Sequence, residues 1–226
     1  MFDLHFFGRG AAFQPSLGNT NAWFTAGNEL FLLDCGESTF EKVVRLPLAT
    51  FARVTVLLTH LHADHAGSLP SLCSYMALRM HKTLHIVYPD TRVIAFLTLT
   101  GIDPSFYAWS ERLGADAPIE AQAVPVEHAR DMACYGYVID RGGARIYYSG
   151  DAAALPEAVR QDFLCGRIER IYHDTARPEA KAHCAYPRLC EAIPPEMRAR
   201  VYCMHLDGDY EPELRALGFS VVTAEP

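Results

Sequence analysis

The sequence predicts an α/β fold, and three observations support this prediction. Two short strand candidates, at 21–25 and 29–34, flank an Ala-Gly-Asn turn that is typical of a hairpin. A continuous apolar strand follows at 54–59, of the kind that is buried on both faces of a sheet. Further strand candidates then alternate with amphipathic helical stretches. The 226 residues contain no linker, so we expect a single domain over 1–226.

The N-terminal half is predicted in the following order. Residues 4–7 form a strand that runs into a glycine loop, and the hairpin at 21–34 comes next. Ser38 and Glu41 have the spacing of a capping box, which predicts a short helix. After the strand at 54–59, apolar residues three and four positions apart predict a helix over 69–80. A strand at 84–88 and helical structure over 91–113, interrupted at 101–104, are then expected.

The C-terminal half continues the alternation. Strands at 135–140 and 144–149 form a hairpin around a glycine pair, and Pro156 lies in the first turn of a helix. The elements expected after it are strands at 169–173 and 200–205 around a helix at 187–193, then a helix at 211–217 and a strand at 219–223.

Composition excludes several classes of protein. Lys and Arg number 20 against 27 Asp and Glu, and a net charge of −7 argues against a dedicated nucleic-acid binder. No apolar stretch of about 18 residues predicts a membrane span, and the first residues do not resemble a secretory signal. Seven cysteines without a C-x-x-C pair fit reduced thiols and a cytoplasmic location.

Metal-ligand residue types are concentrated directly after the apolar strand at 54–59. The segment reads His60-Leu61-His62-Ala63-Asp64-His65. A lone histidine is usually a surface or core residue, but three histidines and an aspartate at a strand end indicate a metal site. Neighbouring side chains point in different directions, so these four do not readily face one ion. The spacing therefore predicts two ions side by side, with further ligands at other strand ends.

Three residues supply those further ligands, since each follows an apolar strand. His128 follows the segment 124–127, Asp151 follows the strand at 146–149, and His205 follows the segment 201–204. With the His60–His65 segment, they complete a set of seven candidate metal ligands.

This set resembles the ligands of the metallo-β-lactamase superfamily, whose fold is a four-layer αββα sandwich with two metals at one sheet edge. The resemblance implies that one ion is held by His60, His62 and His128. It implies that the second is held by Asp64, His65 and His205, with Asp151 bridging the two. Two divalent ions are thus the expected cofactors; zinc is the first choice, and manganese or iron(II) would suit the same ligands.

Within that superfamily, the chain is most similar to the ribonuclease Z-like phosphodiesterases. The glycine loop Gly8-Arg9-Gly10, the stretch Leu32-Leu33-Asp34-Cys35-Gly36-Glu37 and the late residues Asp174 and His183 support this resemblance. The chain departs from the group's pattern at three positions. Arg9 replaces a threonine, Asp174 replaces a glutamate, and Cys184 replaces the hydroxyl residue that usually follows the late histidine.

The tRNA-gripping arm of ribonuclease Z is missing. That arm is inserted between the positions of His128 and Asp151, where this chain has only 22 residues, enough for a plain hairpin. Stable tRNA binding is therefore not expected. The resemblance implies a phosphodiesterase that acts on small or cyclic phosphodiesters or on nucleic acid ends, with a small-molecule or nucleotide substrate.

The expected mechanism is in-line attack on phosphorus by a hydroxide that bridges two ions about 3.5–4 Å apart. Asp64 is both a ligand and the candidate acceptor of the water's proton. His183 is the candidate donor to the leaving alkoxide. Asp174 would orient His183, since a carboxylate beside an imidazole favours its protonated form.

Two alternatives stay open from the sequence. The seven ligand positions also suit a thioesterase or lactonase of the glyoxalase II type, although Asp174 and His183 favour phosphodiesters. A non-catalytic binding module is a more remote alternative, which the intact ligand set disfavours. A homodimer is compatible with the family resemblance and with the frequency of such oligomers.

Overall fold

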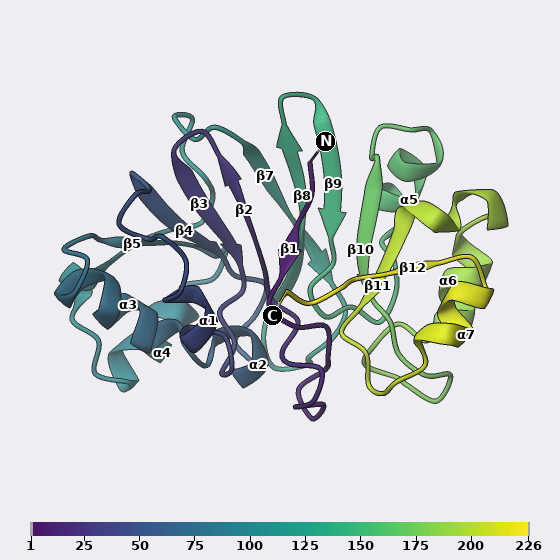
Figure 1. Ribbon diagram of the computed structural model, residues 1–226, viewed down its shortest axis with the longest axis horizontal. Helices are drawn as coiled ribbons and strands as arrows, with labels where there is room; N and C mark the ends of the chain where they lie inside the picture. The colour runs from purple at the N-terminus through teal and green to yellow at the C-terminus, as the bar shows by residue number, and fades with distance from the viewer. Residues whose placement is uncertain (1, 226) are drawn as a thin grey trace.

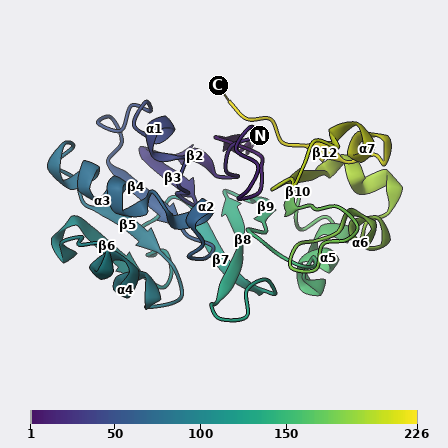
Figure 2. The same ribbon diagram turned by 90° about the horizontal axis from the view of Figure 1, so that it is seen from below.

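The computed structural model describes residues 2–225 and consists of two six-stranded sheets that pack face to face, with helices on both outer faces (Figures 1 and 2). This four-layer arrangement is the αββα sandwich that the resemblance implies. The strands of the first sheet are β1 (His5–Phe6), β2 (Ala22–Ala26), β3 (Glu29–Leu33), β4 (Arg53–Leu57), β5 (Leu84–Val87) and β6 (Tyr107–Ser110). They lie in sequence order; β1 to β3 pair antiparallel, and β3 to β6 pair parallel.

The second sheet mirrors this plan. Its strands are β7 (Glu120–Val126), β8 (Cys134–Arg141), β9 (Ala144–Tyr148), β10 (Arg170–Asp174), β11 (Val201–Met204) and β12 (Ser220–Val221). The strands β7 to β9 pair antiparallel, and β9 to β12 pair parallel. The first sheet is flanked by α1 (Phe40–Val43), α2 (Ala63–Ala66), α3 (Leu69–Leu78) and α4 (Arg92–Leu99), and the second by α5 (Glu157–Leu164), α6 (Tyr186–Ala192) and α7 (Glu211–Ala216).

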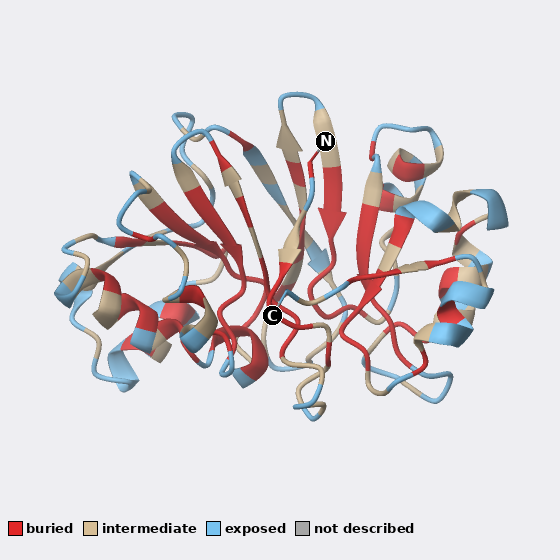
Figure 3. Ribbon diagram, in the orientation of Figure 1, coloured by how far each residue is buried: buried red, intermediate tan, exposed pale blue. Residues whose placement is uncertain are grey.

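Three apolar cores hold the four layers together. Successive side chains of β3 point to opposite faces, so Leu30 and Leu32 pack toward the helices while Phe31 and Leu33 pack between the sheets. In β9, Tyr148 joins the core between the sheets, and Tyr147 joins the core under the C-terminal helices. The central strands β3, β4, β9 and β10 are covered on both faces and are buried over most of their length (Figure 3), which is why they are rich in apolar residues.

Both predicted hairpins are confirmed, but two local predictions are wrong. Residues 107–110 form the edge strand β6 and not a helix. Asp103 caps a short 3-10 turn, its carboxylate accepting a hydrogen bond from the Ser105 amide at 2.8 Å, and the chain then pairs with β5. The helix α1 follows Thr39 without a side-chain cap, and the Ser38 hydroxyl bonds to Asn19 Oδ1 at 2.5 Å.

The strand directions bring the candidate ligands to one edge. The carboxyl ends of β4, β7, β9, β10 and β11 all lie at the lower edge of the sandwich in Figure 1. Loops at this edge are where open α/β sheets place their ligand sites. Within residues 2–225, no helix combines the length and apolar character needed to cross a membrane.

Candidate metal centre

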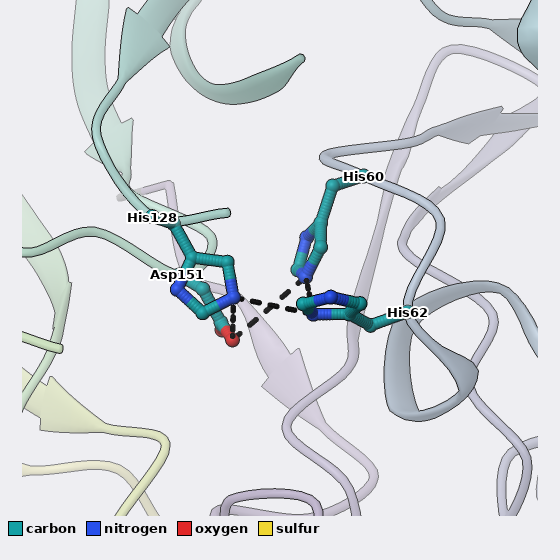
Figure 4. Close-up of side chains that lie close together, drawn as sticks. All are labelled: His60, His62, His128 and Asp151. Carbon is teal, nitrogen blue, oxygen red and sulfur yellow. Dashed lines mark hydrogen bonds and ion pairs between the residues drawn. The ribbon is translucent and has the colours of Figure 1, made fainter. Parts of the chain in front are cut away.

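The first ligand cluster consists of His60, His62, His128 and Asp151, which converge from three segments of the chain (Figure 4). His62 Nδ1 lies 3.0 Å from His60 Nε2 and 3.2 Å from His128 Nε2. Asp151 Oδ2 lies 3.4 Å from His128 Nε2 and 3.8 Å from His60 Nε2. Three imidazole nitrogens and one carboxylate oxygen therefore surround one point, a donor set that suits a divalent transition metal.

The second cluster consists of Asp64, His65, Asp151 and His205. Asp64 Oδ2 lies 3.2 Å from both His65 Nε2 and His205 Nε2. Asp151 Oδ1 lies 3.0 Å from His65 Nε2 and 3.3 Å from His205 Nε2. The two oxygens of Asp151 thus face different clusters, as a bridging carboxylate would.

Asp34 orients His65 through Nδ1, the ring nitrogen that does not face the cluster. The sequence did not reveal this role; it showed only that Asp34 lies in the stretch at 32–37 that resembles the ribonuclease Z-like group. Its Oδ2 lies 2.8 Å from His65 Nδ1, while Oδ1 accepts a hydrogen bond from the Thr59 amide at 2.7 Å. Asp34 adopts a left-handed conformation, with φ of 68°, immediately after β3. Non-glycine residues held in this region cost free energy and are common at functional sites.

Other contacts orient the imidazoles of His60 and His128. The Thr59 hydroxyl lies 3.0 Å from His60 Nδ1, and the Ala182 carbonyl lies 2.9 Å from His128 Nδ1. Each contact leaves Nε2 directed into its cluster. Such outer partners select the tautomer of a ligating histidine and raise its basicity.

Tight packing holds the ligand loop against the first sheet. A Cβ atom at Gly36 would lie 1.8 Å from the Asp64 carbonyl oxygen, so only glycine fits there. The Cys35 amide also donates to the His65 carbonyl at 2.7 Å. The Asp-Cys-Gly-Glu stretch is thus the surface on which the ligand loop rests.

The buried charges of the site fit divalent cations. Burial lowers the pKa of an imidazole, yet Asp151 and Asp34 raise the pKa of His65 well above its ordinary value. Burial likewise opposes a charged His205, but Asp151 and Asp174 raise the pKa of His205 to about 10. His65 Nε2 and Asp151 Oδ1 are buried 3.0 Å apart, yet neither has a well-directed hydrogen bond with any described residue. The second cluster therefore stabilises positive charge and holds buried ligand atoms without a hydrogen-bond partner.

His183 and Asp174 form a pair beside the two clusters. His183 Nδ1 lies 2.7 Å from Asp174 Oδ2, which also accepts a hydrogen bond from the Ala152 amide at 3.0 Å. The His183 ring stacks on His205 with centroids 5.0 Å apart. Burial opposes a charged His183, but the hydrogen bond and charge of Asp174 raise the pKa of His183 above its ordinary value.

A cavity of about 600 Å³ opens over the clusters, within the size range of small-ligand pockets. Five candidate ligands and His183 line it: His62, Asp64, His128, Asp151, His183 and His205. The other lining residues, none of which is fully buried, are called its rim below: residues 11–14, Glu37, Ala63 and Asp207. The interval 129–150 is occupied by the β8–β9 hairpin, and no arm extends from it.

Comparisons with known proteins agree with this geometry. The family model described as "Beta-lactamase superfamily domain" matches residues 30–205. The chain is 25% identical to an anti-Pycsar protein Apyc1 of Bacillus phage BSP38, over 90% of this chain and 88% of that protein.

A ribonuclease Z of Bradyrhizobium diazoefficiens is 32% identical over 64% of this chain and 52% of its own length. The crystal structure of the short form of human tRNase Z superposes with a TM-score of 0.74, at 17% identity, over 99% of this chain and 97% of that chain.

Proposed function

The chain belongs to the beta-lactamase superfamily of metallohydrolases, and from this premise we propose that it is a metal-dependent phosphodiesterase of small or cyclic phosphodiesters. In this proposal His60, His62 and His128 would hold one ion and Asp64, His65 and His205 a second, with Asp151 available to both. Bound divalent ions lower the pKa of water and neutralise charge that builds on phosphoryl oxygens.

The observation that carries the proposal is the His183–Asp174 pair beside the clusters. Phosphodiester cleavage expels an alkoxide, which needs a proton as it leaves. His183 Nδ1 is held by Asp174 at 2.7 Å, so Nε2 is the ring nitrogen available to a substrate in the cavity. The hydrogen bond and charge of Asp174 favour the protonated form of His183, which is the form that a general acid requires.

Asp64 is suited to accept a proton, the role opposite to that of His183. Its Oδ2 contacts the imidazoles of His65 and His205, both at 3.2 Å. Asp64 also lines the cavity, so in this proposal its second oxygen, Oδ1, accepts the proton of the attacking water. A proton acceptor, Asp64, and a proton donor, His183, thus line one cavity. Such a pair suits a reaction in which the attacking water loses a proton and the leaving group gains one.

The size of the site supports small substrates. A hairpin occupies the interval where the resemblance implies a tRNA-gripping arm, and the net charge is −7. The ribonuclease Z relative is matched over about half of its length, so its activity on RNA is not carried over as a whole. A cavity of about 600 Å³ has room for one nucleotide-sized ligand.

The test is hydrolysis of bis(4-nitrophenyl) phosphate and of adenosine 3′,5′-cyclic phosphate by metal-loaded protein. A thioester, S-lactoylglutathione, is assayed in parallel, and each assay is repeated with chelator and after metal is restored. We expect chelator-sensitive cleavage of both phosphodiesters. Cleavage of the thioester alone would overturn the proposal in favour of the glyoxalase II type of chemistry.

A further inference from the structure

We propose that the mouth of the cavity selects a singly charged phosphodiester that carries an uncharged planar ring, which stacks on Phe13. The inference rests on the proposed function and specifies the substrate class of that same site. It is drawn from two features of the rim that the metal chemistry does not use, an exposed aromatic side chain and a pair of carboxylates.

Phe13 is 93% exposed, yet it lines the same cavity as Asp64, Asp151 and His183. It lies in the loop between β1 and β2, which projects beyond the site edge of the sheets in Figure 1 (purple). An aromatic ring left in water at the rim of a cavity has an apolar face available to a ligand. A planar base would cover that face.

The loop that carries Phe13 is held in place against the end of β11. The Ala11 amide donates to the Leu206 carbonyl at 3.0 Å, and the Leu206 amide donates to the Arg9 carbonyl at 2.8 Å. Gln14 Nε2 donates to the Asp207 carbonyl at 3.0 Å. These bonds on both sides of residues 12–13 keep the ring beside the cavity, so stacking would require little ordering of the loop.

The charge of the rim argues against substrates with several phosphates. Among the described residues that line the cavity there is no lysine or arginine, and Glu37 and Asp207 are acidic. Arg9, in the same loop as Phe13, is paired with Glu211. A single phosphodiester charge is met by the metal clusters, whereas a further phosphate at the mouth would face carboxylates.

The first test compares adenosine 3′,5′-cyclic phosphate with methyl ribofuranoside 3,5-cyclic phosphate, which lacks the base. Phe13→Ala should raise KM for the nucleotide by about 5- to 150-fold, the range of base–aromatic stacking, and leave the base-free substrate unchanged. Phe13→Trp should retain the wild-type KM, and Phe13→Leu should behave like alanine. Leu99→Ala is the matched control, because Leu99 is a comparably exposed apolar side chain, 89% exposed, that does not line the cavity.

Equilibrium binding of the phosphorothioate analogue of the cyclic nucleotide, by calorimetry, gives a readout that does not depend on turnover. The inference would be overturned if Phe13→Ala had no effect, or the same effect on both substrates. The proposed function would still stand in that case, provided that cleavage is sensitive to chelator. Failure of the wild-type protein to cleave or bind either substrate would overturn both.

The second test addresses charge. Glu37→Gln should raise the ratio of kcat/KM for the dinucleotide pApA to kcat/KM for ApA by about threefold for each charge that the 5′-phosphate adds, and added salt should diminish this change. The same gain for both dinucleotides would contradict selection by charge.

Discussion

Replacing His183 with alanine should slow cleavage of a phosphodiester with an alkoxide leaving group by about 10²–10⁴-fold. That is the usual contribution of a positioned general acid, and it corresponds to about 2.7–5.4 kcal/mol of transition-state stabilisation. A 4-nitrophenyl ester should be slowed less than about tenfold, because nitrophenolate leaves without protonation. The substrates are the methyl and 4-nitrophenyl diesters of thymidine 5′-phosphate, compared by kcat at saturating concentration.

The structure allows this substitution without collapse of the site. The His183 side chain is 29% exposed, and Asp174 keeps its hydrogen bond from the Ala152 amide at 3.0 Å. Metal content should therefore stay at the wild-type level. His81→Asn is the control, since His81 is exposed, has a φ of 53° that asparagine tolerates, and does not line the cavity. Equal slowing of both esters by His183→Ala would refute the general-acid role.

Three further predictions concern the metal centre. Asp151→Ala should reduce the metal bound at both clusters and abolish turnover, because each carboxylate oxygen of Asp151 faces one of the two clusters. Elemental analysis that still finds two ions per chain would contradict this prediction. Asp34→Asn should weaken binding of one metal by about 10- to 100-fold through loss of its contact with His65, measured by competition with a chromogenic chelator. An unchanged affinity would contradict the orienting role. Chelation should lower Tm by about 5–10 °C. An ion present at 100 times its Kd adds about 2.7 kcal/mol to the free energy of unfolding, and in a chain of 226 residues each kcal/mol shifts Tm by about 2–4 °C. A Tm that does not respond to chelator would show that the clusters hold no ion in the folded protein.

Several elements were predictable because their signals are local. The hairpins have turn residues between apolar runs, and the strand at 54–59 is apolar throughout. Residues 107–110 were not predictable in this way. They form an edge strand of four residues with only one covered face, so the alternation of apolar and polar side chains is too short to distinguish a strand from a helix. Pairing with β5, not intrinsic preference, makes this segment a strand.

The candidate ligands were predictable as residue types, because three histidines and an aspartate lie together at 60–65 and three further ligand types follow strand candidates. That His60, His128, Asp151 and His205 lie close together was implied by the family resemblance, which depends on the order of these residues along the chain. The structure brings them together in clusters that share Asp151.

The sequence did not reveal how the oxygens of Asp151 are divided between the clusters, nor that Asp34 contacts His65 from the side away from the cluster. The sequence also did not reveal that Phe13 lines the cavity. Its loop is held there by hydrogen bonds to Leu206, a residue near the other end of the sequence. Periodicity and residue type report on neighbours in sequence. Contacts between distant segments depend on how the two sheets and their loops pack, and that packing is set by the whole chain at once.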